Sequence, residues 1–188
     1  MRTDITKLFS PNSTLRMKVM EEFVSLQIKN LKGKGHDSKE FRVKRFIELD
    51  DLFFEGLGLW QGDGGKSKGL YFGNSCPEVI NHFLTSVEKK LGIGRKMFRV
   101  TVNSPTEGEE LVIKRRWSKL LGIPIKNFTH VCYDKQIKKE YAQVYINGIV
   151  LLRVMERLHQ TFRPLILTKN EYAIPYLRGF LLLKEVLF

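Results

Sequence analysis

Cysteine is scarce in this chain, with only Cys76 and Cys132 among 188 residues. Two cysteines so far apart cannot build a disulfide framework, and their spacing does not match a zinc site. Long apolar runs are also missing: the longest, at 149–152 and 180–183, fall far short of the roughly 18 residues that a membrane span needs. No apolar segment typical of a signal peptide follows Met1. We therefore expect a soluble, cytoplasmic protein with free thiols.

Acidic residues are few relative to basic ones, with 20 Asp and Glu against 32 Lys and Arg and a net charge of +12. This excess favours a polyanionic partner, most simply nucleic acid. The same charge would also aid solubility or bind acidic lipid, so composition alone leaves these alternatives open. The hydrophobic fraction of 43% and the aromatic fraction of 11% suffice for one packed core and exclude a disordered chain.

The stretch 53–65 combines apolar residues with glycines at helical spacing. Gly58 and Gly62 lie four residues apart, so they share one helix face and leave it open to a second backbone. Asp63 comes at the predicted end of this helix, where the helix dipole disfavours a carboxylate. Two further glycines then end the helix, and the displaced acid suggests a bound cation. The simpler alternative is a helix that ends in an Asp-Gly turn.

The hydrophobic pattern divides the chain into three parts. Residues 1–47 are polar and basic, and the apolar spacing over 18–28 predicts a helix, so this part is interpreted as a basic N-terminal helical extension. Residues 48–165 form the core domain, in which helices alternate with strands, and residues 166–188 form a C-terminal apolar helix. The predicted fold class is α/β, with one small antiparallel or mixed sheet backed by helices. Strands are expected over 68–74, 96–103, 128–134 and 141–147.

The ends of the core helices are marked by capping residues. Asp50 or Asp51 is expected to cap the glycine-rich helix. Pro77 lies near the start of the next helix, where its missing N–H costs nothing. Gly92 and Gly122 are expected to end the second and third helices.

The strands over 96–103 and 141–147 each have a polar face. If one face of the sheet packs on the core, the other stays in contact with water. Arg, Asn and Gln on that face can contact base edges in the major groove, and nearby lysines suit phosphates. The alternative is an ordinary solvated face. The residues predicted to contact DNA are Lys66, Lys68, Arg99, Thr101, Asn103, Lys135, Lys138, Lys139, Gln143, Tyr145 and Asn147.

The segment 58–64, GLWQGDG, resembles the signature helix of the LAGLIDADG homing endonucleases. A strand and a helix follow where that family has them, and the segment 117–124 is similar to one in its archaeal and bacterial members. The resemblance covers residues 51–180. It implies a saddle-shaped sheet over the DNA major groove, two signature helices packed together, and Mg²⁺-assisted hydrolysis of both strands, as in intron homing.

The resemblance also implies roles for individual residues. Asp63 takes the role of catalytic metal ligand, with Gly62 beside it, and a hard cation such as Mg²⁺ suits carboxylate and phosphate oxygens. Asn74 falls where the family often places a polar residue that organises water, although a turn or capping role explains it equally well. The basic active-site residue is unassigned, with Lys68 and Lys135 as candidates.

One signature motif per chain implies a homodimer, whereas family members with two motifs act as monomers. The segment 175–185 resembles a second motif, but it aligns Leu183 with Gly62 and Lys184 with Asp63, so both key residues are replaced. It is either a degenerate motif or a simple apolar helix. A homodimer would read a near-palindromic site, because its two-fold axis must match that of the DNA. Its predicted interface consists of Phe54, Gly58 and Gly62.

The sequence therefore predicts a site-specific, metal-dependent, double-stranded DNA endonuclease that acts as a homodimer. The alternative on the same scaffold is a nucleic-acid-binding protein that does not cleave, such as an RNA maturase or a regulator. A third hypothesis is a basic scaffold domain whose glycine-rich helix only dimerises. The first two predict duplex binding that weakens steeply with salt, and the third predicts no tight binding.

Overall fold

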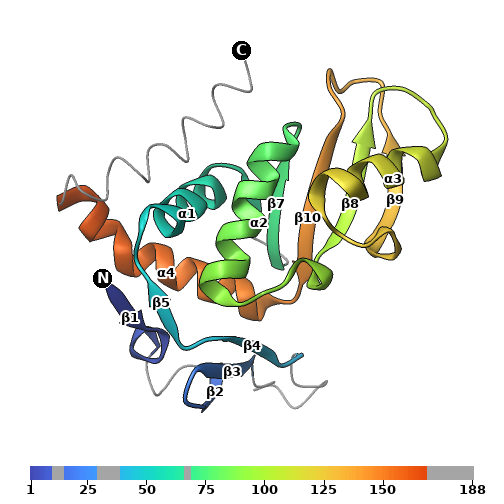
Figure 1. Ribbon diagram of the computed structural model, residues 1–188. Coiled ribbons are helices and arrows are strands. Elements are labelled where there is room, and N and C mark those ends of the chain that lie inside the picture. Colours follow the sequence, from blue (N-terminus) through green and yellow to red (C-terminus); the bar gives the residue numbers. More distant parts are fainter. Residues whose placement is uncertain (10–14, 29–38, 66–68, 169–188) are drawn as a thin grey trace.

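The structure is a computed structural model whose described residues are 1–9, 15–28, 39–65 and 69–168 (Figure 1). The strands are β1 (Arg2–Asp4), β2 (Leu15–Val19), β3 (Phe23–Ile28), β4 (Phe41–Lys44), β5 (Phe46–Glu48), β6 (Gly64–Gly65), β7 (Gly69–Asn74), β8 (Arg99–Ser104), β9 (Phe128–Tyr133) and β10 (Tyr141–Asn147). The α-helices are α1 (Asp51–Asp63), α2 (Pro77–Leu91), α3 (Glu110–Leu121) and α4 (Ile149–Thr168), and short 3-10 turns occupy Ile5–Leu8, Arg95–Met97 and Ile125–Asn127.

The central sheet has five strands in the order β6-β7-β10-β8-β9. Its pairs are antiparallel except for β8 and β9, which run parallel and are joined by the crossover helix α3. Helices α1, α2 and α4 contact β7, and α3 contacts β9, so the helices cover one face of the sheet (Figure 1). The predicted α/β class, with a mixed sheet backed by helices, is confirmed.

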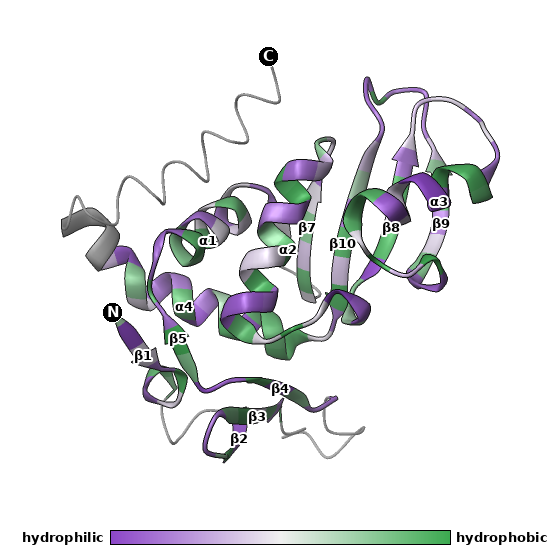
Figure 2. Ribbon diagram, in the orientation of Figure 1, coloured by the Kyte–Doolittle hydropathy of each residue, from purple (hydrophilic) through white to green (hydrophobic). Residues whose placement is uncertain are grey.

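The core lies between this sheet and its helices. Alternate residues of β8 and β10, such as Val100, Val102 and Val144, are fully buried beneath the helices. Figure 2 shows apolar and hydrophilic residues alternating along these helices. Helices α1 and α2 pack closely at Gly56, where an added Cβ would lie 2.0 Å from Ser86 Oγ on α2. A glycine is therefore required for α1 and α2 to approach this closely.

The helix ends follow the predicted capping residues. Asp50, not Asp51, caps α1, because its side chain accepts a hydrogen bond of 3.0 Å from the Phe53 amide. Helices α2 and α3 end at Gly92 and Gly122, both in the left-handed conformation. None of the described helices is long and apolar enough to cross a membrane.

The helix predicted over residues 18–28 is wrong. Residues 15–19 and 23–28 form strands β2 and β3, and β4 completes a three-stranded antiparallel sheet. The Met20 amide donates to the Phe23 carbonyl and closes the hairpin. The alternating residues Val24 and Leu26 are fully buried, so a period of two fits the segment better than a helical period. The N-terminal extension is a small β-structure packed on α2 and α4.

Several sequence predictions fall outside the described residues. These are the DNA contacts at Lys66 and Lys68, the segment 175–185 with its degenerate motif, and most of the C-terminal part 166–188.

Candidate functional site

The C-terminal end of α1 brings the two predicted catalytic residues together. Asp63 is the last residue of the helix and is exposed, while Asn74 is the last residue of β7 and is buried. Asn74 Nδ2 donates a hydrogen bond of 3.0 Å to Asp63 Oδ2. Its Oδ1 accepts one of 2.8 Å from the Cys76 amide at the start of α2. Asn74 therefore fixes the carboxylate of Asp63 and serves as the turn or capping residue considered for it. Its role in organising water stays a prediction.

Asp63 lines a groove of about 590 Å³ that extends to Tyr141 and Gln143 on β10. Lys138 and Lys139, in the turn before β10, line the same groove and are exposed. Two lysines that the sequence assigned only to DNA contact therefore share the groove of Asp63, whereas Lys135 does not line it. The reason is the strand order: β10 enters the sheet next to β7, and Ala142 pairs with Asn74.

The face of the sheet opposite the described helices, called the open face below, carries the predicted polar residues in register. Tyr145 pairs with Arg99, Gln143 with Thr101, and Tyr141 with Asn103, so these side chains project from the same face. Asn147 lies two residues beyond Tyr145, also on this face. The predicted sheet face is thus confirmed as one surface. Thr101 differs from its neighbours because it is buried, with 8% of its surface exposed.

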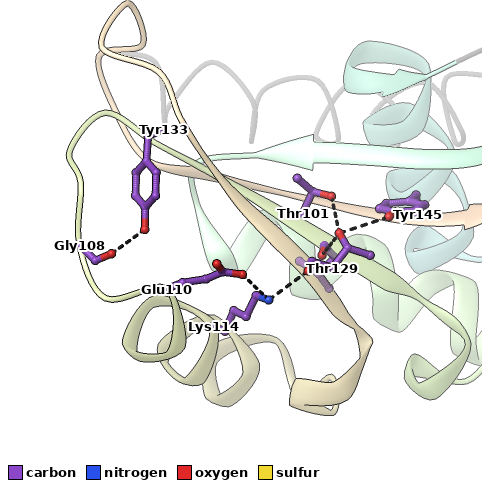
Figure 3. Close-up of polar contacts among 8 residues, drawn as sticks. Thr101, Gly108, Glu110, Lys114, Thr129, Tyr133 and Tyr145 are labelled. Carbon is purple, nitrogen blue, oxygen red and sulfur yellow. Dashed lines mark hydrogen bonds and ion pairs between the residues drawn. The ribbon is translucent and has the colours of Figure 1, made fainter.

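The buried position of Thr101 reflects a hydroxyl network across three strands (Figure 3). Its Oγ1 lies 2.9 Å from Oγ1 of Thr129 on β9. Thr129 also accepts a hydrogen bond of 3.5 Å from the Tyr145 hydroxyl. The Thr129 carbonyl accepts a hydrogen bond of 3.0 Å from the Lys114 ammonium on α3. Lys114 also forms an ion pair with Glu110. Thr101 therefore holds Thr129, which in turn bonds to the Tyr145 hydroxyl on the same face.

Sequence reasoning missed two residues of the open face. Tyr71 lies directly opposite Tyr145 on β7, and their ring centroids are 5.9 Å apart with planes inclined by 26°. Thr129 was missed because a bulge in β9 shifts the register after Val100. For Tyr71 a signal existed: Leu70 and Phe72 are the buried alternate residues of the same strand, which places Tyr71 on the other face.

The thiol next to this site is not suited to nucleophilic chemistry. Cys76 is half-buried and free, and its Sγ donates to Glu78 Oε2 at 2.9 Å. Burial, together with the Glu78 carboxylate, raises the pKa of the Cys76 thiol. The thiol therefore stays protonated at neutral pH.

The residues at the end of α1 fit a divalent cation in part. Asp63 Oδ2 is engaged by Asn74, while the exposed carboxylate keeps further lone pairs directed at the groove. Gly62, the other predicted ligand, is also exposed. Within the described ranges, no three His, Cys, Asp or Glu side chains gather as a complete metal site. Such an ion would need further oxygen ligands from phosphate, water or another acid.

The predicted dimer residues differ in accessibility. Phe54 has no exposed surface and packs edge-to-face on Phe53. Gly58 is also buried within the chain, whereas Gly62 is exposed. A second copy meeting this helix would therefore reach it at Gly62 rather than at Phe54.

In comparisons with known proteins, no family model, no curated protein and no solved structure matches the chain.

Proposed function

We propose that this protein is a site-specific, divalent-metal-dependent DNA endonuclease of the LAGLIDADG type. The observation that carries the proposal is the end of α1, where Asp63 is held by Asn74 and faces a groove shared with Lys138 and Lys139. The groove leads directly to a polar sheet face that includes Arg99 and Gln143. An acid fixed beside cations at the edge of such a face suits phosphodiester hydrolysis.

In this proposal each part of the groove has its own task. Asp63 and the Gly62 carbonyl would hold Mg²⁺, which when bound polarises a phosphate and lowers the pKa of a coordinated water. Asn74 orients the carboxylate by donating to Oδ2. Lys138 and Lys139 are the candidates for the basic partner, because an ammonium near the scissile phosphate offsets charge on its oxygens. The lysines also bind the backbone without reading sequence.

The active unit in this proposal is a homodimer. Of the described residues that line the groove, Asp63 is the single acid, and hydrolysis of both strands calls for two such centres. A two-fold axis near Gly62 would bring two Asp63 carboxylates close together. Two carboxylates at that distance repel each other unless a cation lies between them. Sedimentation with and without Mg²⁺ tests this: a dimer that forms or tightens with Mg²⁺ is expected, and a monomer bound to cleaved duplex would contradict it.

The cleavage test starts from a random duplex library. Duplexes that the wild-type protein retains are amplified and then assayed for cutting with Mg²⁺ and with EDTA. We expect cutting only with Mg²⁺, and we expect Asp63→Asn to bind the same duplexes without cutting them. Cutting by Asp63→Asn at the wild-type rate would refute the role of this acid.

A second candidate is a non-cleaving nucleic-acid-binding protein, such as an RNA maturase or a regulator. One observation favours it: the groove contains one acid, and the described residues include no fuller metal-ligating cluster. Tight, salt-sensitive binding by the wild-type protein without any cutting would select this function instead.

A further inference from the structure

A row of four residues crosses the open face of the sheet in direct register. Gly65 on β6 pairs with Tyr71 on β7, Tyr71 pairs with Tyr145 on β10, and Tyr145 pairs with Arg99 on β8. The two tyrosine rings are nearly parallel, with centroids 5.9 Å apart. A side chain at Gly65 would come within 3.0–3.1 Å of Tyr71, so the glycine leaves room for the ring. The middle of the row is therefore a pair of aligned aromatic rings.

The hydroxyl network fixes how the Tyr145 ring lies. Its hydroxyl reaches Thr129 on β9, although β8 separates β10 from β9. A side chain that spans a neighbouring strand must lie across the sheet and cannot stand upright from it. Figure 3 shows the hydroxyl directed at Thr129, beside Thr101. The Tyr71 ring is inclined by only 26° to it, so the two rings are nearly parallel. Both are half-buried, so part of each remains accessible from the open face.

This arrangement exists before any ligand arrives. Thr129 is held by the Thr101 hydroxyl, and its carbonyl is held by Lys114. A ring already fixed in place loses little side-chain entropy when a ligand binds. Burial and the neighbouring tyrosines also raise the pKa of Tyr71, so its hydroxyl stays neutral and does not repel phosphate.

We propose that Tyr71 and Tyr145 form a stacking platform for unpaired bases of single-stranded nucleic acid. In a duplex the grooves expose the edges of the bases, whereas a ring lying flat on a sheet offers its face. Faces of bases are free in single strands, which stack on aromatic side chains of open sheets. Exposed Arg99 ends the same row, and its cation complements the phosphate charge.

This inference rests on the proposed use of the sheet face for nucleic acid, but not on cleavage. It explains why a surface suited to edge contacts by Arg99 and Gln143 also carries two flat rings. A single strand becomes available wherever a duplex opens, and RNA supplies one directly. Because every base has an aromatic face, the platform should accept both DNA and RNA strands.

The first test uses the wild-type protein alone. Fluorescence anisotropy compares labelled 12-nucleotide deoxythymidine and uridine strands with an abasic strand of equal length. All three carry the same phosphate charge, so tighter binding of both base-containing strands comes from their bases. We expect both base-containing strands to bind roughly 5- to 150-fold more tightly for each stacked base. Equal affinity for the abasic strand would overturn the proposal.

Variants locate the effect on the two rings. Combining Tyr71→Leu with Tyr145→Leu should reduce binding of base-containing strands to the level of the abasic strand, while the salt dependence of binding stays unchanged. Changing both to Phe keeps the rings but removes the hydrogen bond from Tyr145 to Thr129, so the Phe pair should bind more tightly than the Leu pair and less tightly than wild type. Tyr133→Leu is the matched control, since Tyr133 is exposed on β9 and bonds instead to the Gly108 carbonyl. Leu variants that bind as tightly as wild type would refute the platform.

The two proposals can fail separately. A wild-type protein that prefers base-containing strands but cuts no duplex would retain the platform and reject the endonuclease. A protein that cuts duplexes through Asp63 but does not distinguish thymidine from abasic strands would reject the platform alone.

Discussion

Asp50 and Asp63 lie at opposite ends of α1, and their surroundings differ in every respect that matters for a carboxylate. Asp50 caps the helix N-terminus, where the positive end of the dipole favours it, and it forms an ion pair with Lys90 on α2. Asp63 ends the same helix, where the dipole disfavours it, and its described partner is the neutral amide of Asn74.

The difference separates stability from function along one helix. The Asp50 carboxylate satisfies backbone donors and the ammonium of Lys90, which is 7% exposed, so the fold needs it. Asp63 is exposed and does not cap the helix, so we expect it to contribute little to the stability of the fold. With 13 residues between the two ends, the two carboxylates are about 20 Å apart along the helix axis. Changes at one end should therefore leave the other unaffected.

The largest expected effect is on cleavage at the Asp63 end. Removing even an outer-shell partner of a metal costs about 10- to 100-fold, so Asp63→Asn should lower the cleavage rate at least about 100-fold. The midpoint of urea unfolding should stay at the wild-type value, because the side chain is exposed. Single-turnover cleavage with Mg²⁺ and urea unfolding of the same preparation measure the two quantities. A large loss of stability would show that Asp63 is structural.

The opposite behaviour is expected at Asp50. Asp50→Ala removes the cap of α1 and leaves Lys90 with only the more distant Glu48 carboxylate, at 3.9 Å. The free energy of unfolding should therefore fall by about 2 kcal/mol. Asp51→Ala is the matched control, because Asp51 is exposed in the first turn of the same helix and should cost less than about 1 kcal/mol. Urea unfolding measures both. Equal losses would mean that the dipole, and not the cap, explains the contribution of Asp50.

Much of this architecture was predictable because local signals set it. The bounds of α1 follow from Asp50 and the glycines after Asp63, and Gly92 and Gly122 end α2 and α3 as expected. The N-terminal extension was mispredicted because the apolar residues over 18–28 fit a helical period nearly as well as a hairpin. The partner that decides between them, β4, comes after the hairpin in sequence and supplies pairing that no local pattern contains.

The candidate site was predictable only in part for the same reason. Asp63 and Asn74 were identified, yet their hydrogen bond depends on β7 ending beside α1. Lys138 and Lys139 lie far from Asp63 in sequence, and only the insertion of β10 next to β7 brings them to the groove. The alternation with Leu70 and Phe72 places Tyr71 on the open face, but its pairing with Tyr145 depends on the same strand order. Strand order is a long-range property, so it does not appear in the spacing of residues.

A smaller effect is expected at Asn74, which touches both the Asp63 carboxylate and the fold. Asn74 is a positioning residue, so Asn74→Ala should lower the cleavage rate about 10-fold. The unfolding free energy should fall by about 1 kcal/mol, because the Cys76 amide loses its acceptor. Asn74→Asp keeps that acceptor but places a like charge next to Asp63.

The Asp variant at position 74 distinguishes positioning from simple support. Two adjacent carboxylates resist full ionisation, which raises the pKa of the pair. The cleavage rate of Asn74→Asp should therefore recover as pH rises, relative to wild type. A pH–rate profile parallel to that of the wild-type protein would indicate that Asn74 supports the turn and does not act on Asp63.

The smallest effect concerns the acid dependence of stability and again belongs to Asp50. Burial opposes ionisation of this carboxyl, but hydrogen bonds from Lys90 and the Phe53 amide outweigh it, so the pKa of Asp50 is lowered in the folded state. The unfolded chain then binds the proton first, and the stability from this group is lost as pH falls from about 5 through the folded pKa. The pKa of Asp4 is also lowered, because hydrogen bonds from Arg45 and Thr6 outweigh its burial.

Urea unfolding between pH 7 and pH 3 should therefore show a weaker acid dependence for Asp50→Ala than for wild type, with a residual slope from Asp4. Lys90→Met should weaken the slope in the same way, and combining both changes should add little, since they remove one interaction. An unchanged slope in both single variants would assign the acid sensitivity to other carboxyls.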